Sequence, residues 1–294
     1  MPGKHAYLIM CHSNFRILEK LIGAIDDPRN DIYIHIDKKA VLAEQIKSCI
    51  KPHYSNISYV ERIDVAWGGF SQIQAEILLM KAATKTYHDY YHLISGVDFP
   101  LKSQDEIHAF FDAEPQKEYI QIDAISEHGE EFAERLRFYR FLQDRIGRNA
   151  GIRIALLEKI EHLSLAVQKK LGVNRMRQGG KVYKGPNWFS ITHDMAQYIL
   201  SKEDEIFHRY RYCLCADEIF LQTMAMQSPF KENVANDCLR MIDWDRGTPY
   251  IFVSDDFQSL IQSKQLFARK FDETVDFRIV ERLWNYVTAW KESH

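Results

Sequence analysis

Two hydrophobic periods alternate along the first hundred residues of the chain. Runs rich in β-branched and aromatic side chains are typical of strands, and four of them occupy residues 6–11, 31–36, 57–60 and 90–94. Residues 15–25 and 71–83 instead carry apolar side chains at helical spacing. Because parallel strands need crossover connections such as helices, this alternation predicts βαβ units. We therefore expect an α/β fold with a mostly parallel central sheet flanked by helices.

The pattern changes after the fourth predicted strand. From about residue 126 to about residue 180 the sequence is charged and helical in spacing, which predicts a helical insertion. Residues 187–191 then resemble a strand, and Thr192 resembles a helix N-cap. Because no linker interrupts the chain, we expect a single domain over residues 1–294. Its two halves should cover about 1–125 and about 181–294.

Composition and charge narrow the class of protein. The chain has 294 residues, 46% of them hydrophobic, and a formal net charge of −3, which is ordinary globular composition. A near-neutral balance gives no general attraction for nucleic acid, so we expect no nucleic-acid partner. The apolar run near the N-terminus is far shorter than the ~20 residues that span a bilayer. Five cysteines without CxxC spacing predict neither disulfides nor structural zinc, and a reducing cytoplasm fits best.

Polar side chains follow predicted strands, where ligands bind in open α/β sheets. Asp37 can accept hydrogen bonds from a ribose or a base, and a turn or capping role is the commoner interpretation. Asp98 follows a Gly-containing turn, where related folds place a metal-binding Asp-x-Asp, but only one Asp is present. Bracing the turn before Pro100 is an equal alternative. No GxGxxG or GxxxxGK[ST] motif supports a Rossmann or P-loop site.

Acidic residues also mark the second half of the chain. Asp217 and Glu218 begin an apolar run, CADEIFLQTM, that predicts a helix. Capping of that helix is the commoner role for such a pair, whereas a fixed carboxylate can also serve as a general base. Asp243 and Asp245 flank Trp244 as Asp-x-Asp, and a solvent-facing turn is the commoner interpretation of so short a match.

Two cations and two tryptophans each allow both a binding role and a structural role. Arg269 and Lys270 lie between aromatic residues in LFARKFD. Their charge can offset that of a diphosphate, or the side chains can extend to solvent from an element end. Trp67 and Trp188 can stack on sugars or fill the core.

Taken in order, these segments resemble the core 2/I-branching N-acetylglucosaminyltransferase and peptide O-xylosyltransferase family. The resemblance covers about residues 6–272. It rests on seven motifs in the order in which the family has them, namely AYLIMCH with IYIHIDKKA, VAWGGFSQIQAE, YYHLISGVDFPLK, GPNWFSIT, CADEIFLQT, IDW and LFARKFD. It implies a GT-A-like single-domain fold and an inverting transfer of sugar from a UDP donor to an acceptor hydroxyl, without a divalent metal.

The resemblance also implies roles for individual residues. Glu218 matches the catalytic base of the family, and Lys270 matches the lysine that contacts the UDP diphosphate. The remaining expected donor-binding residues are Asp37 for the uridine, Trp67 for the donor pocket and Arg246 as the nearest candidate for a second diphosphate cation. Contacts with the donor sugar or the acceptor are expected from Asp98, Trp188, Asp217 and Trp244.

The chain departs from animal members of the family, which carry an anchor, a stem and disulfides. We therefore expect a bacterial-type enzyme of surface polysaccharide synthesis, in the cytoplasm or at the inner face of the membrane, with a glycan or lipid-linked saccharide acceptor. The expected donor sugar is N-acetylglucosamine, with xylose or another hexose as the alternative. Two competing hypotheses are a metal-dependent transferase of the same fold and a non-catalytic carbohydrate-binding protein.

The predicted insertion contains a stretch, from Arg135 to Arg145, that combines arginines with aromatic residues. A solvated helix face is the commoner interpretation of such a stretch, and an acceptor or membrane-surface face is the less common one. The sequence does not indicate an oligomeric state.

Overall fold

The central element of the fold is a six-stranded sheet with strand order β3-β2-β1-β4-β7-β6. The computed structural model describes residues 3–123, 134–175 and 181–289. The first four strands run parallel, and β7 is antiparallel to both of its neighbours. The expected α/β fold with a mostly parallel sheet is thus confirmed. The strands are β1 (His5–Cys11), β2 (Asn30–Ile36), β3 (Asn56–Tyr59), β4 (Tyr90–Ser95), β6 (Tyr119–Ile120) and β7 (Phe189–Thr192).

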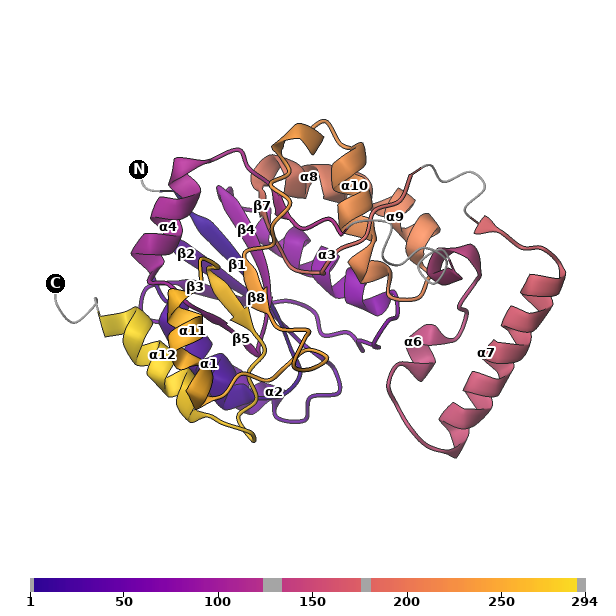
Figure 1. Ribbon diagram of the computed structural model, residues 1–294, viewed down its shortest axis with the longest axis horizontal. Helices are drawn as coiled ribbons and strands as arrows, with labels where there is room; N and C mark the ends of the chain where they lie inside the picture. The colour runs from indigo at the N-terminus through magenta and orange to yellow at the C-terminus, as the bar shows by residue number, and fades with distance from the viewer. Residues whose placement is uncertain (1–2, 124–133, 176–180, 290–294) are drawn as a thin grey trace.

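Helices cover both faces of this sheet (Figure 1). Alternate residues of β1 supply the two cores, because successive side chains of a strand point to opposite faces. Tyr7 and Ile9 belong to the core under α1 and α12, whereas Ala6 and Leu8 belong to the core under α3 and α8. The helices and short helical turns outside the predicted insertion are α1 (Phe15–Ile25), α2 (Ala43–Cys49), α3 (Ser71–Ala83), α4 (Gln104–Ala113), α8 (His193–Ser201), α9 (Glu203–Tyr210), η3 (Ala216–Glu218), α10 (Phe220–Gln227), η4 (Lys231–Asn233), η5 (Ser254–Asp256), α11 (Phe257–Gln262) and α12 (Arg278–Thr288).

A second, three-stranded sheet joins distant parts of the chain. It consists of β5 (Asp98–Pro100), β9 (Phe267–Arg269) and β8 (Arg240–Ile242), with β9 in the middle. Asp98 lies opposite Arg269 in the antiparallel pair, and Ile242 lies opposite Arg269 in the parallel pair. The buried guanidinium of Arg240 donates hydrogen bonds to main-chain carbonyls of β4 and β7. The small sheet is therefore fixed against the large one.

The predicted insertion contains α6 (Gln143–Ile146) and α7 (Ile152–Lys170) in its described part. Figure 1 shows α7 at the edge of the molecule, beyond α6. Among the described residues, no helix combines the length and the apolar character needed to cross a bilayer. The expected division of the chain into one domain with two halves stays a prediction.

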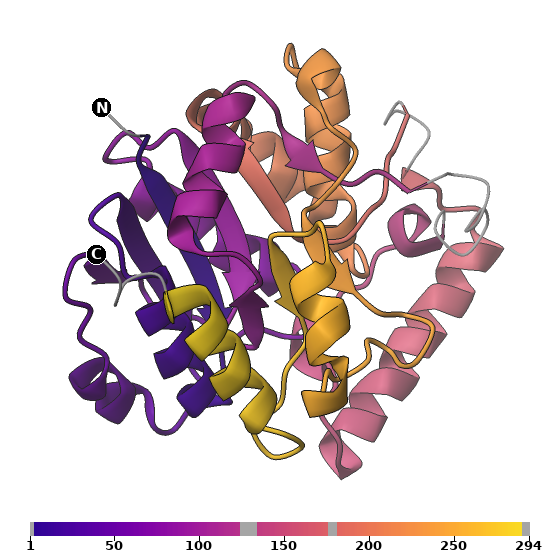
Figure 2. The same cartoon turned by 60° about the vertical axis from the view of Figure 1, so that its left-hand side comes forward.

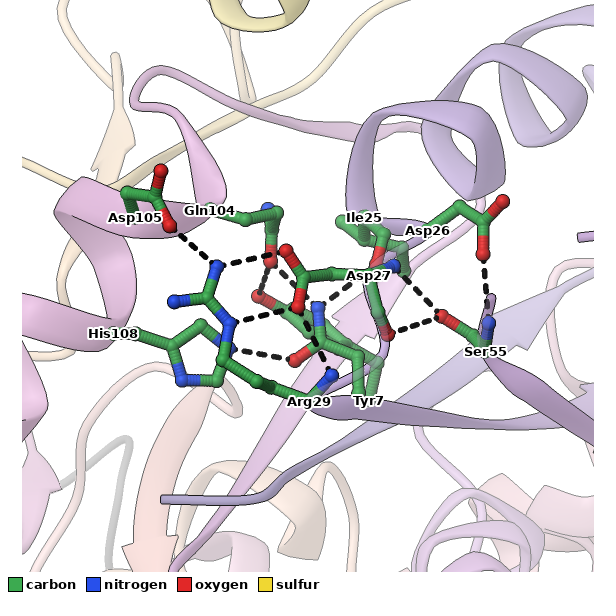
Figure 3. A network of polar contacts seen from close by, with 10 residues as sticks. Tyr7, Ile25, Asp26, Asp27, Arg29, Ser55, Gln104, Asp105 and His108 are labelled. Carbon is green, nitrogen blue, oxygen red and sulfur yellow. Dashed lines mark hydrogen bonds and ion pairs between the residues drawn. The ribbon is translucent and has the colours of Figure 1, made fainter. Parts of the chain in front are cut away.

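The amino edge of the large sheet is closed by a polar network (Figure 3). The Arg29 guanidinium pairs with Asp27 at 2.7 Å and with Asp105 of α4 at 2.6 Å. The Gln104 Oε1 atom accepts hydrogen bonds from the Tyr7 hydroxyl and from the Asn30 amide. These contacts fix α4 to the beginnings of β1 and β2.

Most predicted elements agree with the structure within one or two residues. Thr192 is the N-cap of α8, and its side chain accepts a hydrogen bond from the Met195 N–H. One prediction is wrong. The run CADEIFLQTM is not one helix, because η3 ends at Glu218 and α10 begins at Phe220. Glu218 is therefore the last residue of a 3-10 turn.

Candidate active site

The strand order reverses at β1, which has β2 on one side and β4 on the other. Ligands of open α/β sheets bind beyond the carboxyl ends of the strands at such a point. His12 directly follows β1, and Asp37 directly follows β2. Partial desolvation lowers the pKa of His12, the cations Arg269 and Lys270 lower it further, and Asp37 opposes them. The charges of Asp37 and Lys270 thus both act on His12, which follows β1 and was not among the predicted site residues.

Asp37 has a structural role in its own turn. Its carboxylate is buried, and Oδ1 accepts a hydrogen bond from the Lys39 N–H at 2.8 Å. The Arg62 guanidinium donates to the carbonyls of Asp37, Lys38 and Ala40, which holds the turn from the opposite side. These contacts match the turn interpretation, and the uridine contact stays a prediction.

The turn that contains Trp67 lies at the beginning of α3. Trp67 is 45% exposed, and the Arg148 guanidinium stacks on its ring at 4.2 Å. Gly68 has a φ of +68°, and a Cβ atom there would lie 3.1 Å from the Cys215 Sγ atom. The Gln143 amide of α6 donates to the Trp67 carbonyl at 2.9 Å. Trp67 is thus a surface aromatic residue in a tightly held turn and does not fill the core.

The Gln72 side chain connects this turn to Asp217, the neighbour of the predicted base Glu218. The Gln72 Oε1 atom accepts a hydrogen bond from the Gly68 N–H at 2.6 Å. Its Nε2 atom donates to the Asp217 Oδ2 atom at 3.0 Å. The beginning of α3 and the turn η3 are therefore joined, although they are far apart in the sequence.

Asp217 and Glu218 differ sharply in their surroundings. Asp217 is only 7% exposed, whereas the Glu218 side chain is 35% exposed and its Oε2 atom pairs with the Arg135 Nη1 atom at 2.8 Å. Neither residue lies in α10, so capping of that helix does not describe the pair. The interpretation of the Arg-rich stretch as a solvated face is wrong for Arg135, whose partner Glu218 lies outside the insertion.

A second buried carboxyl group lies behind this pair. Glu76 of α3 is fully buried, and neither of its carboxyl oxygens has a hydrogen-bond partner of normal geometry among the described residues. Burial first, and then the charge of Asp217, raise the pKa of Glu76 well above its usual value. Burial and the charge of Glu218 raise the pKa of Asp217 to about 7. The burial of two neighbouring carboxyl groups therefore opposes their ionisation, and the charge of either one opposes that of the other.

Asp98 and Trp188 both contact Arg269. Asp98 is completely buried, and its Oδ1 atom pairs with the Arg269 Nη1 atom at 2.7 Å. Its Oδ2 atom accepts a hydrogen bond from the Ser95 N–H, which braces the turn after β4. The Arg269 guanidinium stacks on the Trp188 ring at 4.1 Å. These contacts neutralise Arg269, whereas no hydrogen bond or ion pair within the described chain involves the Lys270 ammonium.

Arg246 is held between two carboxylates. It pairs with Asp243 at 2.5 Å and with Asp256 at 2.7 Å, and it stacks on Tyr250 at 4.0 Å. Trp244 in the same loop is 60% exposed. The Asp-x-Asp sequence thus forms a turn around Arg246. Throughout the described ranges, no three His, Cys, Asp or Glu residues gather in a way that could hold a metal ion.

One hollow of about 460 Å³ lies elsewhere, between α1, α12 and residues 49–53. Figure 2 shows α1 and α12 side by side on this side of the molecule. None of the predicted site residues lines it. The candidate site is therefore defined by its side-chain contacts and by its place at the carboxyl edge of the sheet.

Known proteins resemble this chain over most of its length. The family model described as Branch: Core-2/I-Branching enzyme matches residues 5–252. Xylosyltransferase 2 of Rattus norvegicus is 25% identical over 305 residues, which cover 95% of this chain and 33% of the relative. Xylosyltransferase 1 of Homo sapiens is 24% identical over 313 residues, which cover 97% of this chain and 30% of the relative. The chain thus spans about a third of the length of these relatives.

Among solved structures, mouse xyloside xylosyltransferase 1 in its apo form aligns with 90% of this chain and 96% of its own. The TM-score is 0.36 and the sequence identity is 11%. At this level of similarity the match adds nothing to the assignment.

Proposed function

Because this chain belongs to the Core-2/I-Branching enzyme family, we propose that it is an inverting glycosyltransferase that moves a sugar from a UDP donor to an acceptor hydroxyl. The observation that carries this proposal is the partly exposed Glu218 carboxylate, paired with Arg135 and connected through Asp217 and Gln72 to the turn of Trp67. A partly exposed carboxylate held in one orientation can contact an acceptor hydroxyl and take its proton.

Glu218 acts as the general base in this mechanism. The acceptor hydroxyl attacks the anomeric carbon from the face opposite UDP, while Glu218 takes the hydroxyl proton. The C–O bond to UDP breaks, and the electron pair leaves with the diphosphate. A positioned base of this kind contributes typically ~10²- to 10⁴-fold in rate. The ion pair with Arg135 holds the Glu218 carboxylate in place beside the acceptor.

Lys270 stabilises the departing UDP. Fixed positive charge near a developing negative charge lowers the barrier without reorganisation. Arg269 is neutralised by Asp98, and Arg246 is shared between two carboxylates. Lys270 has no carboxylate partner among the described residues, so its ammonium is the best placed of the three cations to bind a diphosphate. We propose that no divalent metal is required.

Two donor sugars remain candidates. N-acetylglucosamine is the expectation from the sequence, and the relatives named as xylosyltransferases favour xylose. The acceptor is proposed to be a glycan or lipid-linked saccharide, and the compartment to be a bacterial cytoplasm. All five cysteines carry free thiols, which supports a reducing compartment.

The test is UDP release from UDP-N-acetylglucosamine and UDP-xylose, with and without EDTA. A thermal-shift screen first selects the sugar nucleotides that bind, because ligands of the folded state raise its melting temperature. We expect one donor to be turned over, and we expect EDTA to leave the rate unchanged. Loss of turnover in EDTA would favour a metal-dependent transferase. Stabilisation by sugars without any UDP release would favour a non-catalytic carbohydrate-binding protein.

A further inference from the structure

The outer face of α7 is apolar, although it faces solvent. Six hydrophobic side chains recur at intervals of three or four residues along the helix and its C-cap. At 3.6 residues per turn they occupy about a third of the helix circumference. Their exposed fractions are 92% for Ile152, 59% for Leu156, 48% for Ile160, 66% for Leu163, 49% for Val167 and 73% for Leu171.

The inner face of α7 mixes polar and apolar residues, since Ile154 and Leu157 are partly buried there. Its buried residues are Glu161, Leu165 and Gln168. Gln168 exchanges hydrogen bonds with the main chain of Tyr139, and Glu161 accepts one from the Leu142 N–H. Surface helices normally bury their apolar stripe and expose their polar one. Here a second apolar stripe stays on the outside, which indicates that it is covered by something apolar, since exposed patches of this kind mark interaction sites.

The charges on α7 indicate what covers this stripe. Arg153, Lys159 and Lys170 are exposed, and at 100° per residue they lie within or beside the apolar stripe. Glu158 and Glu161 project from the opposite side of the helix by the same geometry. An apolar stripe with cations at its borders and acids kept away is typical of a helix that lies on an anionic membrane surface.

A second copy of the chain fits this face less well. Consider two copies that pair about a twofold axis through the middle of the stripe, with their α7 helices antiparallel. Arg153 of one copy would then lie near Lys170 of its partner. Like charges in this arrangement repel, whereas anionic headgroups would attract both.

We propose that α7 docks the protein on an anionic lipid bilayer, with its outer stripe inserted at the boundary between headgroups and acyl chains. The segment before α7 contacts the candidate site directly, through Gln143 and Arg148 at the Trp67 turn. Docking therefore holds that turn close to the lipid surface. This deepens the proposed function and rests on it in one respect, since it selects a lipid-linked acceptor over a free glycan.

Vesicle flotation tests the docking without any enzymatic readout, so its failure is distinguishable from failure of the proposed glycosyltransferase activity. The full chain is mixed with vesicles of phosphatidylcholine alone or with added phosphatidylglycerol. We expect binding to the anionic vesicles only, weakened by salt. The double variant Leu156→Gln with Leu163→Gln should lose at least about tenfold in partitioning. Triple charge reversal at Arg153, Lys159 and Lys170 should also lose at least about tenfold.

The matched control is Val41→Gln with Leu42→Gln, which removes two exposed apolar side chains away from α7. It should bind vesicles like the unmodified protein. Circular dichroism and sedimentation velocity of each variant check the fold and the oligomeric state. The proposal is overturned by absence of binding to anionic vesicles or by binding that the α7 variants leave unchanged. It is equally overturned by a dimer that those variants dissociate, because a second copy would then cover the stripe.

Discussion

At the scale of single residues, the proposed chemistry depends most directly on Glu218. Its carboxylate is partly exposed and paired with Arg135, whereas the adjacent Asp217 is buried. Replacement Glu218→Gln keeps the shape of the side chain but removes its basicity. We expect turnover to fall by about 10²- to 10⁴-fold, with UDP affinity by calorimetry unchanged. The control is Glu232→Gln in η4, where the side chain is 85% exposed. Normal turnover in Glu218→Gln would contradict the base assignment.

Lys270 is expected to act on binding of UDP as well as on its departure. Hydrogen bonds to charged groups contribute about 1.5–3 kcal/mol, so Lys270→Ala should raise the Kd for UDP by about tenfold or more. Isothermal titration calorimetry measures this, and Lys264→Ala, in the exposed loop before β9, is the control. If Lys270→Ala binds UDP normally and Arg246→Ala does not, the diphosphate role belongs to Arg246.

At the scale of elements, the joint between α3 and η3 positions the candidate site. Gln72 makes two hydrogen bonds, one to the Trp67 turn and one to Asp217. Gln72→Met fills a similar volume but removes both. Because small displacements of reacting groups are costly, we expect turnover to fall by roughly tenfold to a hundredfold. The control is Gln74→Met on the exposed side of the same helix. Equal turnover in the two variants would show that Gln72 does not position the site.

The strands that place the site could be predicted from the sequence, whereas the local geometry at Glu218 could not. The two-residue and helical periods are properties of neighbouring residues, so α1, α3 and the parallel strands follow from them. The break between η3 and α10 depends on the Gly185 N–H, which donates to the Glu218 carbonyl at 3.0 Å. That contact comes from a distant segment, and the apolar run itself continues through the break.

The two adjacent cations of LFARKFD are a second case in which the sequence could not predict the local contacts. Their charge could be predicted as a feature of the site, but the pairing register decides which one is neutralised. Arg269 lies opposite Asp98 in the small sheet and pairs with it. Glu76 was missed for a similar reason, as was the pairing of Arg135 with Glu218, since the partners lie on different elements. His12 was visible as a polar residue after a strand, and only the neighbouring charges distinguish it.

At the scale of the whole molecule, buried histidines should make stability depend on pH. His5 stacks on His108 at 3.9 Å and lies 3.1 Å from His92. Burial, and then the nearby Arg29 charge, lower the pKa of His108 to about 4. The unfolded chain, with a histidine pKa of about 6.5, therefore binds more protons as the pH falls. The free energy of unfolding that is present above about pH 6.5 should therefore be lost as the pH falls through the pKa of His108 in the folded protein, about 4.

Replacement His108→Gln tests this dependence, because an amide can still donate to the Asn30 Oδ1 atom that His108 contacts at 2.9 Å. The free energy of unfolding, measured in urea, should change less with pH in this variant, by up to about 3 kcal/mol between pH values of about 7 and about 4. His208→Gln at an exposed position of α9 should keep the original dependence. An unchanged pH profile in His108→Gln would place the acid sensitivity elsewhere.

The central position of β9 in the small sheet has a consequence for any shortened form of the protein. The family match ends at residue 252, before β9 and α12 begin. A chain cut there would keep β5 and β8 but lose the strand between them. The buried Asp98 carboxylate would lose Arg269, and breaking a buried ion pair in this way costs about 3–5 kcal/mol. The boundary of sequence similarity is therefore not a boundary at which the polypeptide can be divided.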